Sequence, residues 1–598
     1  MKSKSMGRTI SHSGPSRSGA TRLLLDIHFC RKTIAWIALA GAAIYANALR
    51  CGFQFDDGYA IVENGFLRNI FDPAAIWSFD PPRFLTYLSF ATNLFFTGLN
   101  VTAFHATNIL IHIANSGLVF FLVMITAQTP RLHQTTTPEA SRAIALLSAL
   151  IFLCHPLQTQ AVTYIVQRSA SLATLFYLGT LTSYALARLM LSRPWYLAAC
   201  VMCFAGMFAK QIMFTAPLTI LLYDILFFDK HAEPDRKRWP RFVPFLVSLA
   251  VIPLLTVFGG LRGVQADGIP TVAGAIPHAQ YLMTQSNVLV TYLRLLVLPV
   301  RQMLEYDYPV VKNLLEIRAL LSLALLVALW VAAIRLRRRR PLIAFGILWF
   351  FVTVSVESGL IALPHVIFEH RMYLPMAGCA VAVSAAAWLM LRQKSRYLIF
   401  GVLVVSALSL LTVRRNETWK DKLTLWQDNV RKAPERGSVR YSLGLAYAEL
   451  GQHGDAMREF QRALDLGYAH GRVYFSRARV WEALQKKDAA IRDYETGLGL
   501  DPEFVPALNN LGTLWAEQKR FDRALLMYQR ASELAPANPQ ILANLGTTYA
   551  QMGRNEQAAL ILELALRIDP SFSPARANLQ KIRALTQKTE DPNPVPPQ

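Results

Sequence analysis

Residues 397–413 read YLIFGVLVVSALSLLTV, an apolar run without a single charged residue. A helix of this length rises about 25 Å, which nearly spans the ~30 Å hydrocarbon core of a bilayer. Basic residues stand at both of its ends, Arg396 before it and Arg414 after it. We therefore predict a transmembrane helix here. The sequence before this helix is rich in apolar runs, whereas the sequence after it is mainly polar.

Ten further apolar runs precede this helix. Because polar segments separate them, they predict a polytopic all-α membrane domain with about eleven spans. Two amphiphilic stretches, 84–98 and 282–300, either cross the bilayer as well or lie along its interface. The ten runs are 33–49, 104–126, 143–156, 169–190, 195–210, 213–228, 242–260, 316–334, 342–360 and 373–391.

Charge and hydropathy narrow the class of protein. The 598 residues carry a net charge of +22, a mean hydropathy of +0.29 and only 17% charged residues. Residues 1–413 hold 35 Lys and Arg against 17 Asp and Glu, whereas residues 414–598 hold 26 against 22. The positive excess thus lies in the apolar half. This argues against a soluble cytosolic enzyme and against a nucleic-acid-binding protein.

The same charges predict the topology. If both amphiphilic stretches lie at the interface, one side of the membrane holds 24 of the 35 basic residues, including Arg236-Lys237-Arg238 and Arg337 to Arg340. The positive-inside rule makes that side cytoplasmic. The N-terminus then lies in the cytoplasm, and everything after residue 413 lies outside it.

The C-terminal half contains a 34-residue repeat. Leu443-Gly444, Leu511-Gly512 and Leu545-Gly546 recur at this spacing or at twice it. Small residues at fixed positions let two antiparallel helices approach, so the pattern predicts tetratricopeptide repeats, an α-solenoid that binds peptides or protein surfaces. The alanines in register are Ala456, Ala490, Ala524 and Ala558.

These observations predict five segments. They are a basic disordered cytoplasmic tail over 1–32, a transmembrane domain over 33–413, a linker or leading helix over 414–436, four tetratricopeptide repeats over 437–572, and a terminal helix with a disordered tail over 573–598.

Polar residues concentrate in the predicted outer segments. Asp56 and Asp57 follow the first helix, and adjacent acids at a membrane exit indicate either a wet loop or a functional group, a general base or a metal ligand. Further outer segments carry ionisable and polar groups, among which arginine suits the binding of phosphate. They are His155, Arg168, Lys210, Glu369, His370, Arg371 and Tyr373. Cationic groups beside apolar helices suit a lipid-linked phosphate, and an acid could activate an acceptor hydroxyl, which predicts glycosyl transfer.

Five blocks in this order resemble the transmembrane and tetratricopeptide-repeat O-mannosyltransferases, which are GT-C glycosyltransferases. The resemblance covers the chain except its N-terminal tail. The blocks are FDDGYAIVEN (55–64), PRFLTYLSFATNLFFTGLNVTAFHATNILIHIAN (82–115), HPLQTQAVTYIVQRSASLATLFYL (155–178), Lys210-Gln211 and EHRMYLP (369–375).

The resemblance implies a GT-C fold with interfacial helices in the first outer loop. Asp56 or Asp57 would be the catalytic base, and a polyprenyl-phosphate sugar would be attacked with inversion. Arg168, Lys210 and Arg371 would hold the donor phosphate, whereas His155, Glu369, His370 and Tyr373 would contact sugar or acceptor. Such monophosphate donors generally need no metal, and a divalent cation stays an open alternative. Cys200 and Cys203 form a CxxC in an apolar run, which lacks the polar support of a metal site.

Departures from the family limit what is carried over. Gln158, Gln160 and Gln211 replace His, Glu and Glu of the family, so the sugar and the acceptor stay open. The basic tail and short loops suggest a bacterial inner-membrane protein with periplasmic repeats that bind acceptor or partner protein. Two alternatives remain: an oligosaccharide ligase that uses a diphosphate lipid, and a non-enzymatic membrane-anchored scaffold for envelope assembly.

Overall fold

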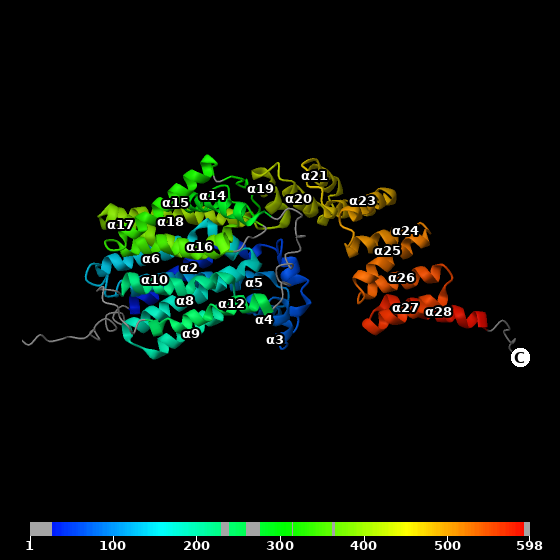
Figure 1. The fold of residues 1–598 in the computed structure, drawn as a ribbon, viewed down its shortest axis with the longest axis horizontal. Coiled ribbons are helices and arrows are strands. Elements are labelled where there is room, and N and C mark those ends of the chain that lie inside the picture. Colours follow the sequence, from blue (N-terminus) through cyan, green and yellow to red (C-terminus); the bar gives the residue numbers. More distant parts are fainter. Residues whose placement is uncertain (1–26, 229–238, 259–275, 314, 361–364, 591–598) are drawn as a thin grey trace, which may run out of the picture. The chain divides into compact units, whose positions relative to one another are not determined.

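The computed structural model describes residues 27–228, 239–258, 276–313, 315–360 and 365–590, and its regular elements there are all helices (Figure 1). This agrees with the all-α class predicted from the sequence. The predicted N-terminal tail lies largely outside the described residues, as does the extreme C-terminus. The chain divides into two units, Met1–Asp428 and Asn429–Gln598.

Each of the eleven apolar runs contains at least one helix of the first unit. Six helices among the described residues are long and apolar enough to cross a membrane, or seven if the bent pair Pro138–Cys154 and Pro156–Val162 forms one span. The count of eleven spans therefore stays a prediction. The helices of the runs are α2 (Ile27–Ile44), α5 (Val101–Thr126), α6 (Pro138–Cys154), α8 (Arg168–Met190), α9 (Arg193–Gly206), α10 (Ala216–Phe227), α11 (Val243–Ser248), α12 (Val251–Phe258), α15 (Ile317–Leu336), α16 (Pro341–Ser355), α17 (Tyr373–Leu391) and α18 (Lys394–Glu417).

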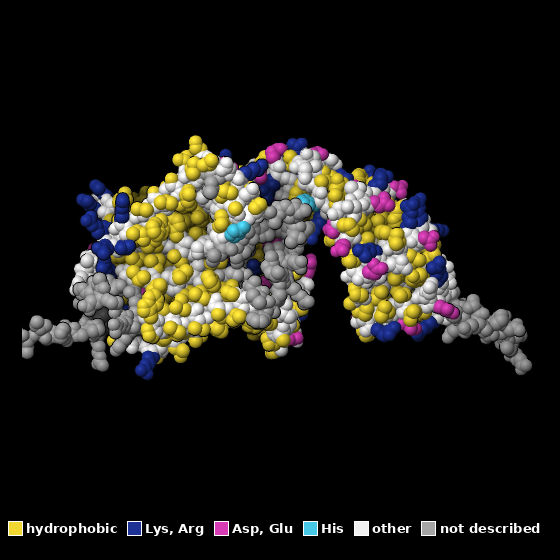
Figure 2. All heavy atoms as spheres, viewed as in Figure 1, with side chains coloured by type: hydrophobic (Ala, Val, Ile, Leu, Met, Phe, Trp, Pro, Cys, Tyr) yellow, Lys and Arg dark blue, Asp and Glu magenta, His cyan; other side chains and the backbone are white. Residues whose placement is uncertain are grey.

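Three of the loops that the charge pattern assigns to one side meet at one end of this unit. Arg131 donates to the carbonyl of Arg338 at 3.2 Å, and Lys394 pairs with Glu139 at 2.6 Å. Figure 2 shows Lys and Arg side chains gathered at one end of the broad hydrophobic surface of this unit. We call the opposite end of this unit the site end. The segments that connect the helices there carry the predicted functional residues.

The first loop at the site end folds into a small layer of short helices. Aromatic and aliphatic side chains give this layer a core of its own, which includes Ile61, Ile76, Phe90, Phe104 and Ile165. The amphiphilic stretch 84–98 forms one of these helices, and 282–300 forms α14 (His278–Val297). The helices of the layer are η2 (Gly58–Val62), η3 (Gly65–Leu67), α3 (Pro73–Phe79), η4 (Pro81–Arg83) and α4 (Phe84–Thr97).

The second unit consists of four antiparallel helix pairs and a terminal helix. Its small residues lie where two helices approach, as the repeat pattern requires. A Cβ atom on Gly444 would lie 2.6 Å from the ring of Phe460, and one on Gly512 would lie 2.8 Å from the ring of Tyr528. The helices are α20 (Gly437–Glu449), α21 (His453–Asp465), α22 (Gly471–Ala483), α23 (Lys487–Leu500), α24 (Val505–Glu517), α25 (Phe521–Leu534), α26 (Pro539–Gln551), α27 (Asn555–Ile568) and α28 (Ser573–Glu590).

This packing predicts opposite effects of two glycine replacements. Gly512→Ala forces the buried Tyr528 ring to move and should destabilise the repeats by about 1–3 kcal/mol. Gly454→Ala, on α21 with nothing within 4 Å, should stabilise them by about 0.5–1 kcal/mol. Hydrogen–deuterium exchange of the full chain should show faster exchange in α24 and α25 for Gly512→Ala only. Equal exchange in the two variants would contradict the helix–helix approach at Gly512.

Candidate functional site

The two adjacent acids of the first loop have different environments. Asp57 is fully buried, and its carboxylate accepts hydrogen bonds from the backbone amides of Gln54 at 2.8 Å and Val166 at 2.7 Å. Asp56 is half-buried, and its Oδ2 accepts a hydrogen bond from the Tyr164 hydroxyl at 2.8 Å. Asp57 thus fastens the loop to the segment before α8, whereas Asp56 lies nearer the surface.

Burial raises the pKa of the Asp57 carboxyl to about 8. The backbone amides of Gln54 and Val166 oppose this rise, and the neighbouring Asp56 adds to it. Two adjacent carboxylates resist ionising together, because each charge disfavours the other. Burial and the neighbouring acid therefore both favour the protonated form of Asp57.

The raised pKa predicts a pH-dependent stability. An unfolded Asp titrates near 4, so between about pH 4 and pH 8 the folded chain holds a proton on Asp57 that the unfolded chain has lost. The Asp57 contribution to the free energy of unfolding should therefore fall as the pH rises through this window, by up to about 1.4 kcal/mol per pH unit. Thermal unfolding of wild type and Asp57→Asn in detergent between pH 5 and pH 8 tests this. Parallel melting curves at every pH would contradict it.

Three cations gather elsewhere at the site end. Lys210 is 5% exposed, and its Nζ lies 3.1 Å from Oε1 of Glu357, which stands in the helical turn η9 (Val356–Leu360) just after α16. Lys210 and Glu357 both interact electrostatically with Arg83 and Arg371. We call Arg83, Lys210 and Arg371 the cationic cluster. The nearby carboxylates are Glu357 and Asp80, the latter 3.8 Å from Arg83.

The third cation of the cluster, Arg371, is held by neutral groups, and His370 precedes it in the chain. Arg371 donates to the backbone carbonyls of Val366 at 3.1 Å and His365 at 2.8 Å, which orient its guanidinium without cancelling its charge. His370 stacks on Phe368, and its backbone amide donates to Oε1 of Gln160 at 2.6 Å. Within the described part of the chain, the buried Nδ1 of His370 has no hydrogen-bond partner.

The short helix α7 (Thr159–Val162) and the residues just after it contact both the loop of the acids and the segment that carries Arg371. Gln160 on this helix binds the segment of His370, and Tyr164 just beyond it binds Asp56. Residues 160–164 therefore contact both the Asp56 carboxylate and the segment next to Arg371.

Arg168 has a different environment from Lys210 and Arg371. It is fully buried, and its guanidinium lies over the rings of Phe90 and Phe104. Every one of its nitrogens donates to the protein: to the side chains of Ser89, Asn93 and Asn108 and to the carbonyls of Ser89 and Phe104. Arg168 thus joins α8 to α4 and α5, and its expected role as a phosphate ligand stays a prediction.

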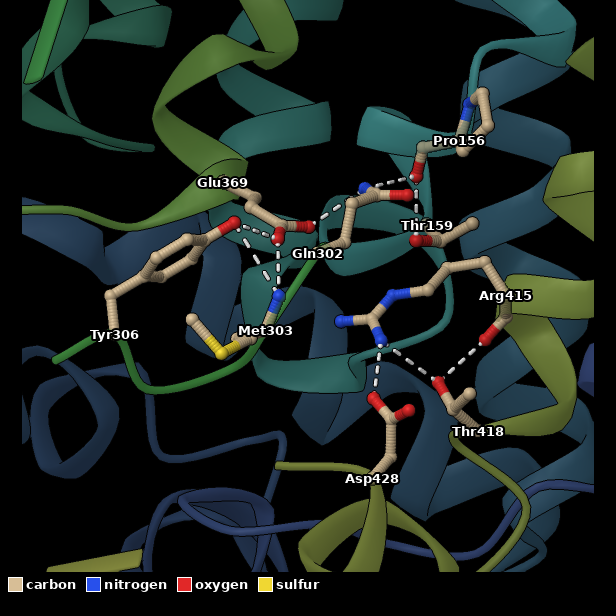
Figure 3. A network of polar contacts seen from close by, with 9 residues as sticks. All are labelled: Pro156, Thr159, Gln302, Met303, Tyr306, Glu369, Arg415, Thr418 and Asp428. Carbon is tan, nitrogen blue, oxygen red and sulfur yellow. Dashed lines mark hydrogen bonds and ion pairs between the residues drawn. The ribbon is translucent and has the colours of Figure 1, made fainter. Parts of the chain in front are cut away.

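Glu369 fastens an extended segment to η10 (Glu369–Met372), as Figure 3 shows. Its carboxylate accepts hydrogen bonds from Gln302 Nε2 at 2.8 Å, the Met303 amide at 2.7 Å and the Tyr306 hydroxyl at 2.5 Å (Figure 3). Its oxygens are therefore occupied by this chain.

His155 and Tyr373 also bond within the protein. The two ring nitrogens of His155 contact the carbonyl of Leu296 and the amide of Leu157, at 3.1 and 3.2 Å. The Tyr373 hydroxyl contacts His112 at 2.7 Å and Asn115 at 3.2 Å. The predicted sugar and acceptor roles of Glu369, His155 and Tyr373 stay predictions, and the structure gives all three side chains partners in the core.

Sequence analysis missed Arg83 and Glu357 as members of the site. Arg83 stands in the block 82–115, but nothing local distinguishes it from an interfacial arginine. Glu357 is an acid within the apolar run 342–360. An ionisable residue in such a run is costly without a partner, and this signal could have linked it to Lys210.

Comparisons with known proteins agree with this architecture. Residues 441–503, 475–539 and 516–582 match tetratricopeptide-repeat family models. The chain is 25% identical over 507 residues to the protein O-mannosyl-transferase TMTC1 of Homo sapiens, covering 73% of this chain and 55% of that protein. It is 24% identical over 486 residues to the protein O-mannosyl-transferase TMTC4 of Mus musculus, covering 70% of this chain and 64% of that protein.

The resemblance predicted from the sequence is therefore confirmed, although the chain spans less than two thirds of the length of these two relatives. Among solved structures, a crystal structure of MamA is 18% identical, covers 25% of this chain and 86% of its own, and has a TM-score of 0.24.

Proposed function

We propose that this chain is a membrane glycosyltransferase that moves a sugar from a polyprenyl-phosphate donor to a hydroxyl group of a protein acceptor. Two observations support the proposal: the similarity to protein O-mannosyl-transferases, and a site that combines a half-buried carboxylate with buried cations. The reaction takes place on the non-cytoplasmic face, where the charge pattern puts the site end, and in a bacterium this is the periplasmic face of the inner membrane.

The cationic cluster carries this proposal. Arg83, Lys210 and Arg371 lie near the carboxylates of Asp80 and Glu357, and cations that gather in this way suit an anionic ligand. Buried charges need a partner, and a sugar phosphodiester of a polyprenol carries one negative charge. We therefore propose a monophosphate donor, with the diphosphate lipid of an oligosaccharide ligase as the alternative.

We assign the role of general base to Asp56. Its carboxylate takes the proton of the acceptor hydroxyl as that oxygen attacks the anomeric carbon. The bond from the anomeric carbon to the phosphate oxygen breaks, and the polyprenyl phosphate leaves with the electron pair. Because the leaving phosphate gains negative charge, the cationic cluster stabilises the transition state more than the bound donor.

The remaining groups support this step. His370, which lies beside the cluster, is assigned to the sugar, because its buried Nδ1 is available for a hydroxyl group. Side chains neutralise the phosphate, so this mechanism needs no metal. The tetratricopeptide repeats are assigned to binding the acceptor or a partner protein.

A direct assay tests the proposal. The full chain is reconstituted in vesicles with a polyprenyl-phosphate hexose, with the corresponding polyprenyl-diphosphate sugar, or with neither, and periplasmic proteins of a deletion strain serve as acceptors. Intact-protein mass spectrometry should detect a hexose increment with the monophosphate donor. Transfer from the diphosphate donor alone would favour the ligase, and no mass shift in any protein or glycan would favour the scaffold.

A further inference from the structure

Residues 415–428, which we call the connection, comprise the end of α18, the turn after it and the first part of α19 (Lys422–Lys432), and they pack against the loop that carries Asp56. The Gln54 side chain donates to the carbonyl of Trp419 at 3.1 Å, and the amide of Gly52 donates to the carbonyl of Lys420 at 3.1 Å. The ring of Phe55 meets that of Trp426 edge to face at 5.8 Å. A segment more than 360 residues away in sequence therefore packs against the loop of the proposed base.

Phe55 needs this support because of its backbone conformation. Its φ is +42°, which is unfavourable for a bulky side chain and persists only where the surroundings impose it. The next residue is Asp56, so the turn at Phe55 sets the direction of the proposed base. Residues 419–426 contact the chain before this turn, at Gly52 and Gln54, and the ring of Phe55 itself.

Trp419 also acts on Asp56 through a second residue. It is fully buried, and its ring stacks on that of Tyr164, with centroids 5.4 Å apart and planes 22° apart. The Tyr164 hydroxyl donates to Asp56 Oδ2 at 2.8 Å and accepts from the Asp56 amide at 3.0 Å. The position of the Tyr164 ring thus determines the orientation of the carboxylate, and Trp419 holds that ring.

An ion pair between Arg415 and Asp428 links the two ends of residues 415–428. Arg415 lies over the Trp419 ring at 5.9 Å, and its Nη1 donates to Asp428 Oδ2 at 3.1 Å and to Thr418 at 3.2 Å (Figure 3). Both partners of the ion pair are largely buried. Asp428 stands in α19 (Lys422–Lys432), so the pair joins the last predicted span to the helix that follows it.

We propose that Trp419 is a positioning residue for the transfer reaction, which holds Tyr164 in the place where its hydroxyl orients the Asp56 carboxylate. This inference rests on the proposed function. The connection 415–428 then belongs to the catalytic end of the protein and is more than a linker to the repeats. A tryptophan that only fills the core would affect stability but would leave the ratio of kcat to donor KM unchanged in folded protein.

The test compares three variants of the full chain in the vesicle assay. Trp419→Leu should lower kcat about 30-fold and leave the donor KM within about twofold, because a small misplacement of a reacting group is costly. Trp419→Phe keeps an aromatic ring on Tyr164 and should retain at least about a third of kcat. The matched control is Trp388→Leu, which removes a tryptophan packed on Tyr397, remote from Asp56, and should keep kcat.

A smaller change covers the case in which Trp419→Leu does not fold. Tyr164→Phe removes only the hydroxyl that binds Asp56, and it should lower kcat about tenfold at constant donor KM. Folded Trp419→Leu and Tyr164→Phe proteins with wild-type kcat would overturn the inference and leave the proposed function intact. A wild-type chain without any transfer activity would overturn the proposed function itself.

Discussion

Asp56→Asn is expected to lower the rate of sugar transfer by about three orders of magnitude, within the range of a lost general base. The amide cannot take the proton of the acceptor hydroxyl, but it can still accept the hydrogen bond from Tyr164. The donor KM should therefore stay within about twofold. The assay measures transfer from polyprenyl-phosphate hexose as a function of donor concentration.

Two further variants serve as controls for this prediction. Asp72→Asn changes an exposed acid of the same loop whose Oδ1 caps α3 at the amide of Ala75. An Asn side chain caps equally well, so wild-type activity is expected. A folded Asp57→Asn protein without activity, together with an active Asp56→Asn protein, would move the base to Asp57.

Lys210→Met is expected to raise the donor KM about a hundredfold, because a charge-assisted hydrogen bond to phosphate contributes about 1.5–3 kcal/mol. The variant also leaves Glu357 buried without its cation, so its fold must be verified by thermal unfolding. Arg83→Gln provides a gentler test, because the Arg83 side chain is 35% exposed and its loss should not endanger folding. We expect its donor KM to rise by about an order of magnitude.

The direction in which donor KM changes in a third variant distinguishes a phosphate-binding site from an ion pair that acts only in folding. Glu357 competes with the donor phosphate for Lys210, so Glu357→Gln should leave the donor KM equal or lower. The matched control is Arg68→Gln, an exposed arginine of the first loop, whose donor KM should not change. An increase of KM in Glu357→Gln as large as that in Lys210→Met would show that the pair acts in folding only.

Much of the architecture follows from local patterns. Apolar runs such as 397–413 predict helices because their length matches the bilayer, and each run contains a helix in the structure. The 34-residue period predicts the paired helices of the second unit, because Gly444 and Gly512 admit a neighbouring ring. The basic loops predict which ends lie together, and Arg131 and Arg338 do meet.

The site could be predicted less completely. The sequence identified the outer segments with acids and cations, but it treated Arg168, Lys210 and Arg371 as equivalent. In the structure the guanidinium of Arg168 is fully engaged by α4 and α5, whereas Lys210 and Arg371 share an electrostatic environment with Arg83 and Glu357. Residue type and topology do not reveal whether a side chain has partners within the chain.

The sequence by itself therefore determined the membrane unit, the repeats and the group of segments that share one end, because hydropathy, repeat period and charge are properties of neighbouring residues. Only the tertiary structure decided which acid is buried, which cations gather, and that Trp419 lies behind Tyr164 and Asp56. The physical reason is that burial and hydrogen bonding depend on residues brought together from positions hundreds of residues apart.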